Sequence, residues 1–410
     1  MTEKPAPKSH TKEFSDIQKL SLAEIRQGIT EIDDQLIDLL AKRRDFSRSV
    51  AINKLGDFKP VRDQQREKEL LDILIAKGAA KGLAPHYITR LFHTIIEDSV
   101  ILQGQFLQNH SNPGLLDGGN KTVAVLGGKG AYSYLAAQKY FDGQQATYEA
   151  FDSFEGILNS VQSGENEFGV LPIENTTSGG ITEVYDLLLH SELSIIGEVS
   201  QSINHCLLGQ KTTTLETVKQ VIAHPEARKQ CHHWLGKQQG ISVKLSSSTA
   251  EALRLAADDT SGTIAAIGGE QSADAFGLKV ITRDITNLAE NATRFLVVTK
   301  KPQIVSPQVA CKTSVIISTG QKPGSLAEVL LVFRDARLPL TKLESRPIVG
   351  KPWEQMFYID FEGNIDDPTV IQSLEDIRDI CNFIKILGSY PAEQIKPTRV
   401  SPTEYYRGQD

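Results

Sequence analysis

The feature that most constrains this chain is a helical pattern of apolar residues near its start. Between residues 22 and 54 these residues recur at alternating intervals of three and four, which predicts one long helix with a buried seam. They are Leu22, Ile25, Ile29, Ile32, Leu36, Leu39, Phe46 and Val50. Arg43 occupies a position in the same seam. Because an arginine keeps its charge and is costly to bury alone, the pattern predicts an anion beside it.

Two other cations of this helix extend the argument. Lys54 lies close to three full turns after Arg43, so the two side chains share a face roughly 16 Å apart along the axis and would bracket a small dianion. Arg26 lies roughly 25 Å from Arg43 and off its face. It can serve the same site only from a partner chain, which predicts an intertwined homodimer. A plainer interpretation pairs Arg43 with Asp38 or Glu67.

The whole sequence limits the class of protein. Its 410 residues predict about two to four domains. The net charge of -7 argues against nonspecific binding of nucleic acid. No apolar run is long enough to span a membrane, and the start lacks the apolar core of a signal peptide, so we expect a cytoplasmic protein. The cysteines form no CxxC pair and are expected to be reduced structural thiols.

The helical pattern continues after the long helix. Residues 61–76 form a second, shorter predicted helix, on which Asp63, Arg66 and Glu67 share one face. Residues 1–17, by contrast, are polar, with lysine, proline and serine, and are predicted to be a disordered tail.

A third helix is predicted to open at Pro85, which suits the first turn. Ser99 and Gln103 interrupt its apolar face one turn apart. Two uncharged hydrogen-bonding groups in a seam are typical of ligand contacts. A core network satisfied by the backbone or by Arg43 explains them equally well.

The helical region contains an ordered series of polar residues. The series is Arg26, Arg43, Lys54, Asp63, Arg66, Glu67, Ser99 and Gln103. This order, with the stretches PVRDQQRE and HYITRLFHTIIEDSV, resembles the all-helical chorismate mutase family. The resemblance implies a three-helix domain over residues 18–109 that is swapped into a dimer.

The resemblance also implies a role for most members of the series. Arg43, and Arg26 from the partner chain, would hold the two carboxylates of chorismate, and Ser99 would meet a carboxylate. Lys54 and Gln103 would donate to the ether oxygen. Glu67 and Asp63 would meet the side of the ring hydroxyl. Such a rearrangement to prephenate needs no covalent catalyst, only a held conformation and donors aimed at the oxygen that gains negative charge.

The pattern changes after residues 110–120, which are rich in Asn, Gly and Ser and are predicted to be a linker. Short apolar runs then alternate with amphipathic segments, which predicts an α/β domain over residues 121–300. The expected strands are 122–126, 168–171, 193–199, 218–223, 241–245 and 263–267. The loop LGGKGAYS has Ser133 where a third glycine would belong, so it is a weak dinucleotide signal.

Several motifs of this region resemble prephenate dehydratase. They include GGKGAYSYLAA, VLPIENTTSGGITEVYDLL, HPEARKQC, SSSTAEA and NATRF. The resemblance implies a two-lobed fold like that of bacterial periplasmic binding proteins, with the active site in the cleft. The residues that match its motifs are Glu174, Asn175, Thr176, Ser178, Ser248, Thr249, Thr293, Arg294 and Phe295.

The implied chemistry centres on Thr293, which would assist departure of the ring hydroxyl as prephenate becomes phenylpyruvate, while Arg294 supports the charge of the site. A threonine hydroxyl is a poor acid, so a hydrogen bond to the leaving oxygen or a relay is the expected role. Taken alone, TRFLVVT is an ordinary strand sequence. Glu226 stands where the family usually has glutamine and is left out of the site, because its charge would oppose a dianion.

A second linker is predicted over residues 301–310. The remainder has the βαββαβ order of a ferredoxin-like domain. Its expected elements are 313–319, 324–336, 340–348, 355–362, 368–380 and 382–389.

Residues 311–395 resemble an ACT domain, a family of small amino-acid sensors. The run Glu344, Ser345, Arg346, Pro347 matches the effector motif of phenylalanine-regulated enzymes. The companion run Gly324, Ser325, Leu326, Ala327 departs from the usual Gly-Ala-Leu-Val, a change that would weaken affinity.

Together the resemblances predict a bifunctional enzyme of phenylalanine biosynthesis, without metal or organic cofactor, that L-phenylalanine inhibits at its C-terminal domain. The alternative is a non-catalytic amino-acid sensor in which the other domains only transmit the signal. Lys54, Gln103 and Thr293 count against it, because a pure binder has no use for donors at bond-breaking oxygens.

Overall fold

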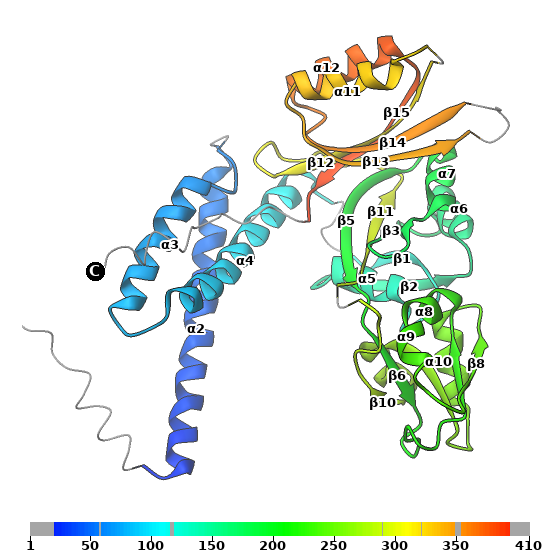
Figure 1. The fold of residues 1–410 in the computed structure, drawn as a ribbon. Helices are drawn as coiled ribbons and strands as arrows, with labels where there is room; N and C mark the ends of the chain where they lie inside the picture. Colours follow the sequence, from blue (N-terminus) through cyan, green and yellow to red (C-terminus); the bar gives the residue numbers. More distant parts are fainter. Residues whose placement is uncertain are drawn as a thin grey trace, which may run out of the picture. The chain divides into compact units, whose positions relative to one another are not determined.

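The computed structural model describes residues 20–56, 59–114, 119–288, 290–320, 322–348 and 354–393. The chain divides into two compact units between Leu107 and Gln108 (Figure 1). The tail predicted over residues 1–17 lies outside the described residues.

Three helices form the described part of the first unit, and all three were predicted. They are α2 (Leu22–Lys54), α3 (Gln64–Ala79) and α4 (Pro85–Ser111), the last of which continues into the second unit. Ser21 begins α2 with a reciprocal cap, in which the Glu24 carboxylate accepts from the Ser21 backbone at 2.7 Å. Asp63 caps α3 by accepting from the Arg66 N–H at 2.9 Å. The second helix therefore begins later than predicted, because Asp63 serves as its cap.

The apolar seam of α2 is exposed in the single chain, so the predicted burial is not provided by the described residues of the same chain. Phe46 is 74% exposed and Ile32 is 58% exposed. The helices of this unit do bury a small core, in which Leu71, Ile75 and Ile96 are almost inaccessible. An uncovered apolar row of this length indicates a surface that another protein chain covers.

The second unit begins with a mixed sheet in the order β2-β1-β3-β11-β5, to which β4 adds beside β3. Its strands are β1 (Lys121–Leu126), β2 (Ala146–Phe151), β3 (Phe168–Asn175), β4 (Gly179–Gly180), β5 (Ser194–Ser202) and β11 (Ala292–Thr299). Its helices are α5 (Tyr132–Tyr140), α6 (Phe154–Ser163) and α7 (Thr182–His190). This first lobe is interrupted, since the chain leaves it after β5 and returns at β11.

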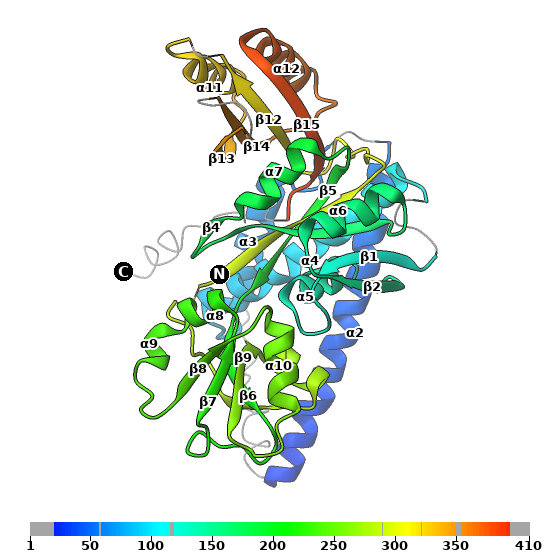
Figure 2. The ribbon, with the colours of Figure 1, turned by 90° about the vertical axis from the view of Figure 1, so that its right-hand side faces the viewer.

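The inserted segment builds a second lobe around the sheet β10-β6-β9-β7-β8 (Figure 2). Its strands are β6 (His205–Gly209), β7 (Gln220–Ala223), β8 (Ser242–Leu245), β9 (Ile264–Gly269) and β10 (Lys279–Thr282). Its helices are α8 (Pro225–Gln230), α9 (His232–Leu235) and α10 (Thr249–Ala257), with 3-10 turns η1 (Glu270–Ser272) and η2 (Asp274–Phe276). The two lobes confirm the predicted α/β architecture, and every expected strand is present. Strands β2, β4, β6 and β10 were missed because they are short or weakly apolar, and β11 was recognised only as the strand-like run TRFLVVT.

Two hydrogen bonds join the lobes near their crossover segments. The Tyr132 hydroxyl at the start of α5 lies 3.0 Å from His205 Nδ1 at the start of β6. The Ser272 hydroxyl donates to the Gly130 carbonyl at 2.7 Å. The glycine-rich loop before α5 therefore packs against the other lobe.

The last part of the chain forms the predicted ferredoxin-like arrangement. Its elements are β12 (Cys311–Thr319), α11 (Ser325–Asp335), β13 (Leu340–Pro347), β14 (Gln355–Glu362), α12 (Pro368–Ile380) and β15 (Cys381–Pro391). The strands pair antiparallel in the order β13-β14-β12-β15. All six elements match their predictions closely.

The C-terminal sheet is covered on both faces. One face packs on α11 and α12 through Val315 and Phe333. The other face places Ile316 and Tyr358 in one cluster with Ile173 of the first lobe. The sheets approach closely, because a Cβ on Gly388 of β15 would lie 2.3 Å from the Ile195 carbonyl oxygen of β5. Lobe and C-terminal sheet therefore share a core.

Residues 301–310 contain no helix or strand, as expected for a linker, but they are packed. Val305 is 2% exposed, and its carbonyl accepts from Asn364 Nδ2 at 2.9 Å. The Ile304 carbonyl accepts from Gln108 and Asn112, each at 2.7 Å. The segment therefore fastens the end of α4 to the C-terminal sheet.

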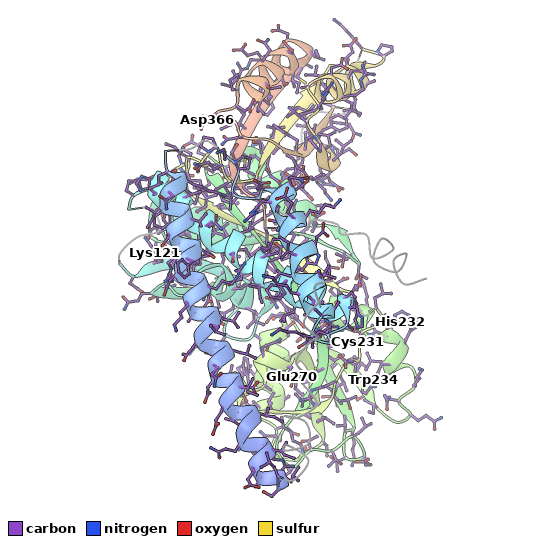
Figure 3. The ribbon with its side chains drawn as sticks, turned by 90° about the vertical axis from the view of Figure 1, so that its left-hand side faces the viewer. Lys121, Cys231, His232, Trp234, Glu270 and Asp366 are labelled. Atoms are coloured by element: carbon purple, nitrogen blue, oxygen red, sulfur yellow. The ribbon has the colours of Figure 1, made fainter. Side chains whose placement is uncertain are left out.

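The cysteines in the described residues are all free. Cys231, labelled in Figure 3, is completely buried, and burial raises the pKa of its thiol to about 12. The half-buried Cys381 has its pKa raised to about 11 for the same reason. These thiols are structural, as predicted. None of the described helices has both the length and the apolar composition needed to cross a membrane.

We predict that Ile316→Ala destabilises the first lobe as well as the C-terminal sheet. Ile316 is completely buried in the shared core, and such a truncation costs about 2–5 kcal/mol. Hydrogen exchange followed by mass spectrometry should show faster exchange in β3 and β5 as well as in β12. The control Ile371→Ala removes a 45% exposed side chain from α12 and should leave β3 unchanged. Faster exchange in β12 alone would mean that the two parts unfold independently.

Candidate functional site

The first candidate site surrounds Arg43. Its Nη1 donates to the Ile95 carbonyl at 3.1 Å and to the Ser99 hydroxyl, which places the two predicted residues Arg43 and Ser99 together. These partners are uncharged, whereas Glu67 pairs with Arg62, so the alternative pairing of Arg43 with Glu67 is wrong. Burial lowers the pKa of Arg43, and nearby Asp98 opposes that shift. A half-buried arginine held by neutral groups keeps its charge available for an anion.

Gln103 adds a second feature to this site. It is 8% exposed, and its Nε2 donates to the Ser99 carbonyl at 3.1 Å. Its Oε1 is buried without a hydrogen-bond partner among the described residues. A buried polar atom left unsatisfied costs about 1–3 kcal/mol, so this atom indicates a place where a ligand binds.

The remaining predicted residues of the helical unit differ in their surroundings. The Lys54 ammonium donates to the carbonyls of Pro60 and Val61 at 3.1 and 2.9 Å. Glu67 lies in the first turn of α3 with a side chain that is 12% exposed. Arg66 is 72% exposed, and Arg26 lies exposed on α2. The single chain therefore gathers Arg43, Ser99 and Gln103 and leaves Arg26 outside that cluster.

The second candidate site lies where β3 pairs with β11, with Asn175 directly opposite Thr293. Asn175 Nδ2 donates to the Thr293 hydroxyl oxygen at 2.9 Å and to Asn291 Oδ1 at 2.8 Å. Asn175 Oδ1 accepts from the backbone N–H groups of Thr177 and Ser178 at 2.9 and 3.0 Å. Because the Thr293 oxygen already accepts from the amide, its own proton is directed elsewhere and can be donated to a ligand.

The next residue of the same strand, Arg294, lies on the opposite face of the sheet, because side chains alternate along a strand. Its nitrogens lie 2.8 Å from Glu174, 3.0 Å from Glu198 and 2.6 Å from Asp360. Burial alone would lower the pKa of Arg294, but the negative charges of Asp360 and Glu198 raise it above its ordinary value. The expectation that Arg294 supports the charge beside Thr293 is therefore wrong. Its guanidinium forms ion pairs between the first lobe and the C-terminal sheet instead.

The ion pairs of Arg294 continue into the predicted effector region. Lys342 lies 2.7 Å from Glu174 and 3.2 Å from Glu344, and Arg346 lies 2.8 Å from Asp186 of α7. Burial alone would raise the pKa of Glu174, but the charge of Arg294 and the hydrogen bond from Lys342 hold it below its ordinary value. Glu174 is thus an ionised link between β3 and β13.

Other predicted dehydratase residues lie apart from the Asn175–Thr293 pair. Phe295 is 2% exposed in the core of the first lobe. Ser248 caps α10 in the second lobe by accepting from the Glu251 N–H at 3.1 Å, and Thr249 begins that helix. The hydroxyl of Thr176 accepts from the Ala292 N–H at 3.0 Å, close to the pair in sequence.

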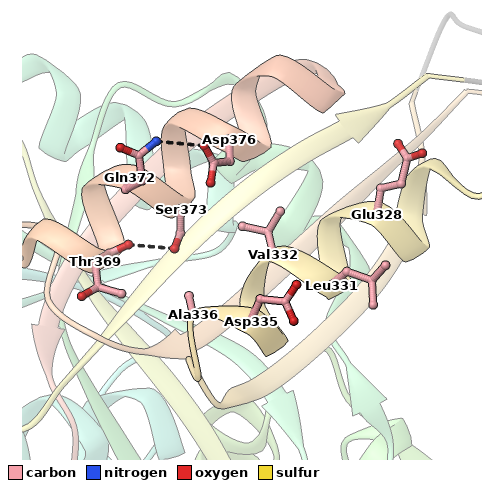
Figure 4. Close-up of a pocket in the computed structure, with 9 residues that line it drawn as sticks. All are labelled: Glu328, Leu331, Val332, Asp335, Ala336, Thr369, Gln372, Ser373 and Asp376. Carbon is pink, nitrogen blue, oxygen red and sulfur yellow. Dashed lines mark hydrogen bonds between the residues drawn. The ribbon is translucent and has the colours of Figure 1, made fainter.

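The predicted effector residues occupy two elements of the C-terminal domain. Glu344 and Arg346 on β13 are half-buried, while Ser345 and Pro347 are exposed. Gly324, Ser325, Leu326 and Ala327 form the start of α11. A separate groove between α11 and α12 is lined by three acidic side chains (Figure 4). These are Glu328, Asp335 and Asp376, and none of the predicted effector residues is among the described residues that line the groove.

Several polar residues beside these sites were not predicted. Arg62 lies within the stretch PVRDQQRE and Asn291 within NATRF, so these two family motifs could have identified both residues. Lys342 and Asp360 carry no local signal, since their partners are distant in sequence. Glu226, which the sequence analysis excluded from the dehydratase site, lies in the first turn of α8 and pairs with Lys229 at 3.3 Å.

Comparisons with known proteins agree with this arrangement. Residues 25–104 match the family of type II chorismate mutases, and residues 123–303 match the prephenate dehydratase family. The bifunctional chorismate mutase/prephenate dehydratase of Escherichia coli strain K12 is 42% identical over 384 residues, which cover 93% of this chain and 98% of that protein.

Solved structures resemble the second unit. The prephenate dehydratase of Arthrobacter aurescens, in complex with L-Phe, has a TM-score of 0.62 and 29% identity over 68% of this chain and 93% of its own. GqqA, described as a novel type of quorum-quenching acylase, has a TM-score of 0.61 and 26% identity over 69% of this chain and 100% of its own. Because such different activities share the fold, function must be argued from sequence identity and from the site.

The family matches and the fold define an enzyme that joins a helical chorismate mutase to a two-lobed prephenate dehydratase. The chain belongs to the family of bifunctional chorismate mutase/prephenate dehydratases. It therefore rearranges chorismate to prephenate and converts prephenate to phenylpyruvate.

We predict that Thr293→Val makes prephenate accumulate from chorismate. The substitution keeps the shape of the side chain but removes the donor, and loss of a positioned proton donor costs roughly a hundredfold or more in rate. Phenylpyruvate formation from supplied prephenate measures the effect.

The matched control is Thr299→Val in the same strand. Thr299 is 3% exposed and donates to the Glu167 carbonyl at 2.9 Å. This variant loses a comparable buried hydrogen bond, yet we expect near-normal dehydration. Equal losses in both variants would make Thr293 a structural residue.

Proposed function

We propose that the helical domain, residues 18–109, rearranges chorismate through the residues gathered around Arg43. Arg43 and Ser99 would bind one carboxylate of chorismate. Gln103 and Lys54 would donate to the ether oxygen as it gains negative charge, with Glu67 and Asp63 on the side of the ring hydroxyl. The observation that supports this assignment is the half-buried Arg43, whose guanidinium has only uncharged hydrogen-bond partners among the described residues, Ile95 and Ser99, and so remains available for a carboxylate.

The complete mutase site requires a second copy of the chain. Arg26 is exposed on α2, along which the uncovered apolar row runs. Pairing α2 with the helices of another copy would bury that row and bring Arg26 to the partner's Arg43 cluster. A homodimer, alone or within a larger homo-oligomer, is therefore the proposed assembly.

The proposed dehydratase site includes Thr293 and its fixed partner Asn175. The Thr293 hydroxyl would donate a hydrogen bond to the departing ring hydroxyl, or relay a proton from solvent to it, while the carboxylate leaves as carbon dioxide and the ring becomes aromatic. Prephenate and the one proton consumed thus give phenylpyruvate, carbon dioxide and water. The loop after Asn175, with Thr176 and Ser178, and the second-lobe residues Ser248 and Thr249 would bind the substrate.

The C-terminal ferredoxin-like domain is proposed to be an ACT domain that binds L-phenylalanine. Residues 324–327 and 344–347 would form its effector site, on an enzyme that works in the cytoplasm with reduced cysteines. Lys342 supports a route for the signal, because it contacts both Glu344 of the effector motif and Glu174, the neighbour of Asn175. An effector that favours one arrangement of β13 would thereby shift the strand that carries Asn175.

The alternative considered from the sequence, a sensor without catalysis, is wrong, because the chain belongs to a family of enzymes that carry out both reactions.

We predict that Lys54→Ala blocks turnover of chorismate but leaves dehydration of supplied prephenate intact. Removal of one preorganised donor costs about 2.7–4 kcal/mol, roughly a hundredfold or more in rate. Lys42→Ala, which removes an exposed lysine from the same helix, is the control and should retain mutase activity. Mutase activity at the normal rate in Lys54→Ala would remove Lys54 from the site.

A further prediction concerns regulation: Lys342→Met should weaken inhibition by phenylalanine more than it weakens phenylalanine binding. The substitution removes the cation shared by Glu174 and Glu344, and typical allosteric coupling amounts to about 1–3 kcal/mol, or roughly 5- to 150-fold. Calorimetry gives the binding constant, and dehydratase assays give the inhibition. The control is Arg334→Met, which changes a 68% exposed arginine on α11. Phenylalanine should inhibit this variant as strongly as it inhibits the unchanged chain. Unaltered inhibition in Lys342→Met would exclude this route.

A further inference from the structure

Arg62 is a buried cation that the mutase chemistry described above does not use. Its side chain is 7% exposed, and it lies just before the cap residue Asp63. Arg62 Nε lies 3.4 Å from Glu67 Oε1 on α3, and Nη2 lies 2.5 Å from Glu97 Oε1 on α4. One guanidinium therefore ties the first turn of α3 to the helix that carries Ser99.

The charge of Arg62 matters because chorismate is a dianion. Glu67 is 12% exposed, so water screens its carboxylate only weakly. Without a neighbouring cation, that carboxylate would repel the substrate that it is proposed to meet. Arg62 offsets this charge through the 3.4 Å contact between its Nε and Glu67 Oε1, and a buried guanidinium keeps its charge.

The same short segment also holds Lys54. Its ammonium is bound by the carbonyls of Pro60 and Val61, the two residues directly before Arg62. Val61 is 8% exposed and anchors the segment in the helical core. Within this segment, the carbonyls of Pro60 and Val61 thus hold the Lys54 ammonium, and Arg62 holds the Glu67 carboxylate.

We propose that Arg62 is a positioning residue of the mutase site, which acts through Glu67 by neutralising its carboxylate. This inference rests on the proposed role of Glu67 in the binding of chorismate. Arg62 itself would not touch the substrate.

The test uses the full chain and measures kcat and KM for chorismate in single and double variants. Arg62→Met should lower kcat/KM by about tenfold to a hundredfold, mainly through a higher KM, because lost neutralisation weakens ground state and transition state alike. Arg62→Lys, which keeps the charge, should recover a large part of the loss. In the Glu67→Gln background, Arg62→Met should add less than about twofold, since no carboxylate remains to be neutralised.

The matched control is Arg44→Met. Arg44 also pairs with a carboxylate of α4, Asp98 at 3.2 Å, but its side chain is 52% exposed. Mutase activity in this control should stay within about twofold, because an exposed ion pair contributes little. Helical circular dichroism and dehydration of supplied prephenate establish that each variant is folded.

The outcomes separate the inference from the function on which it rests. If Arg62→Met is folded and nearly as active as the unchanged chain, or loses as much activity in the Glu67→Gln background as alone, Arg62 is not a positioning residue. If Arg62→Met does not fold, Arg62→Gln, which also removes the charge but keeps polar groups, takes its place in both backgrounds and is judged by the same comparison. Normal mutase activity in Glu67→Gln alone would overturn the role proposed for Glu67, and with it the inference.

Discussion

The pairing of β3 with β11 is the constraint on which the larger unit depends. Because side chains alternate along a strand, this one register places Asn175 against Thr293 on one face and Glu174 against Arg294 on the other. The first pair belongs to the proposed dehydratase site. The second pair faces the C-terminal sheet, where Asp360 completes the ion pairing of Arg294. The proposed dehydratase site and the contact with the C-terminal sheet therefore lie at two consecutive residues of each strand.

A buried charge network of this kind adds little stability, because well-packed apolar residues of similar volume stabilise a core equally well or better. Such a network instead fixes the orientation of the first lobe relative to the C-terminal sheet. Glu198 is 1% exposed and holds both Arg294 and Lys312, so lobe and sheet are aligned by bonds that tolerate few geometries. Around these charges, Ile316 and Tyr358 complete the core of the first lobe. The C-terminal domain is thus built into the enzyme rather than attached to it by a linker.

Much of the fold could be predicted from periodicity and turn residues. The long helix, Pro85 at the start of α4 and all six C-terminal elements follow local patterns, and local patterns decide local structure. The differences between the predicted and observed elements also have physical causes. Strand β2 alternates too weakly to be distinguished from a loop, and the second helix starts late because the Asp63 side chain accepts the Arg66 N–H. The apolar seam of α2 was expected to be covered, but its cover does not come from the described part of the same chain.

The sequence by itself supplied the candidate residues of both sites, and five of them lie together as predicted: Arg43, Ser99 and Gln103 in one site and Asn175 and Thr293 in the other. Only the tertiary structure decided what each of them faces. Arg294 adjoins Thr293 in the chain, yet its side chain lies on the opposite face of the sheet and pairs with Asp360. The role proposed for Arg62 follows from its ion pairs with Glu67 on α3 and Glu97 on α4, which only the folded chain brings together. The reason is that residue type and local periodicity are properties of a segment, whereas burial, charge pairing and partner choice arise between segments that the chain brings together from a distance.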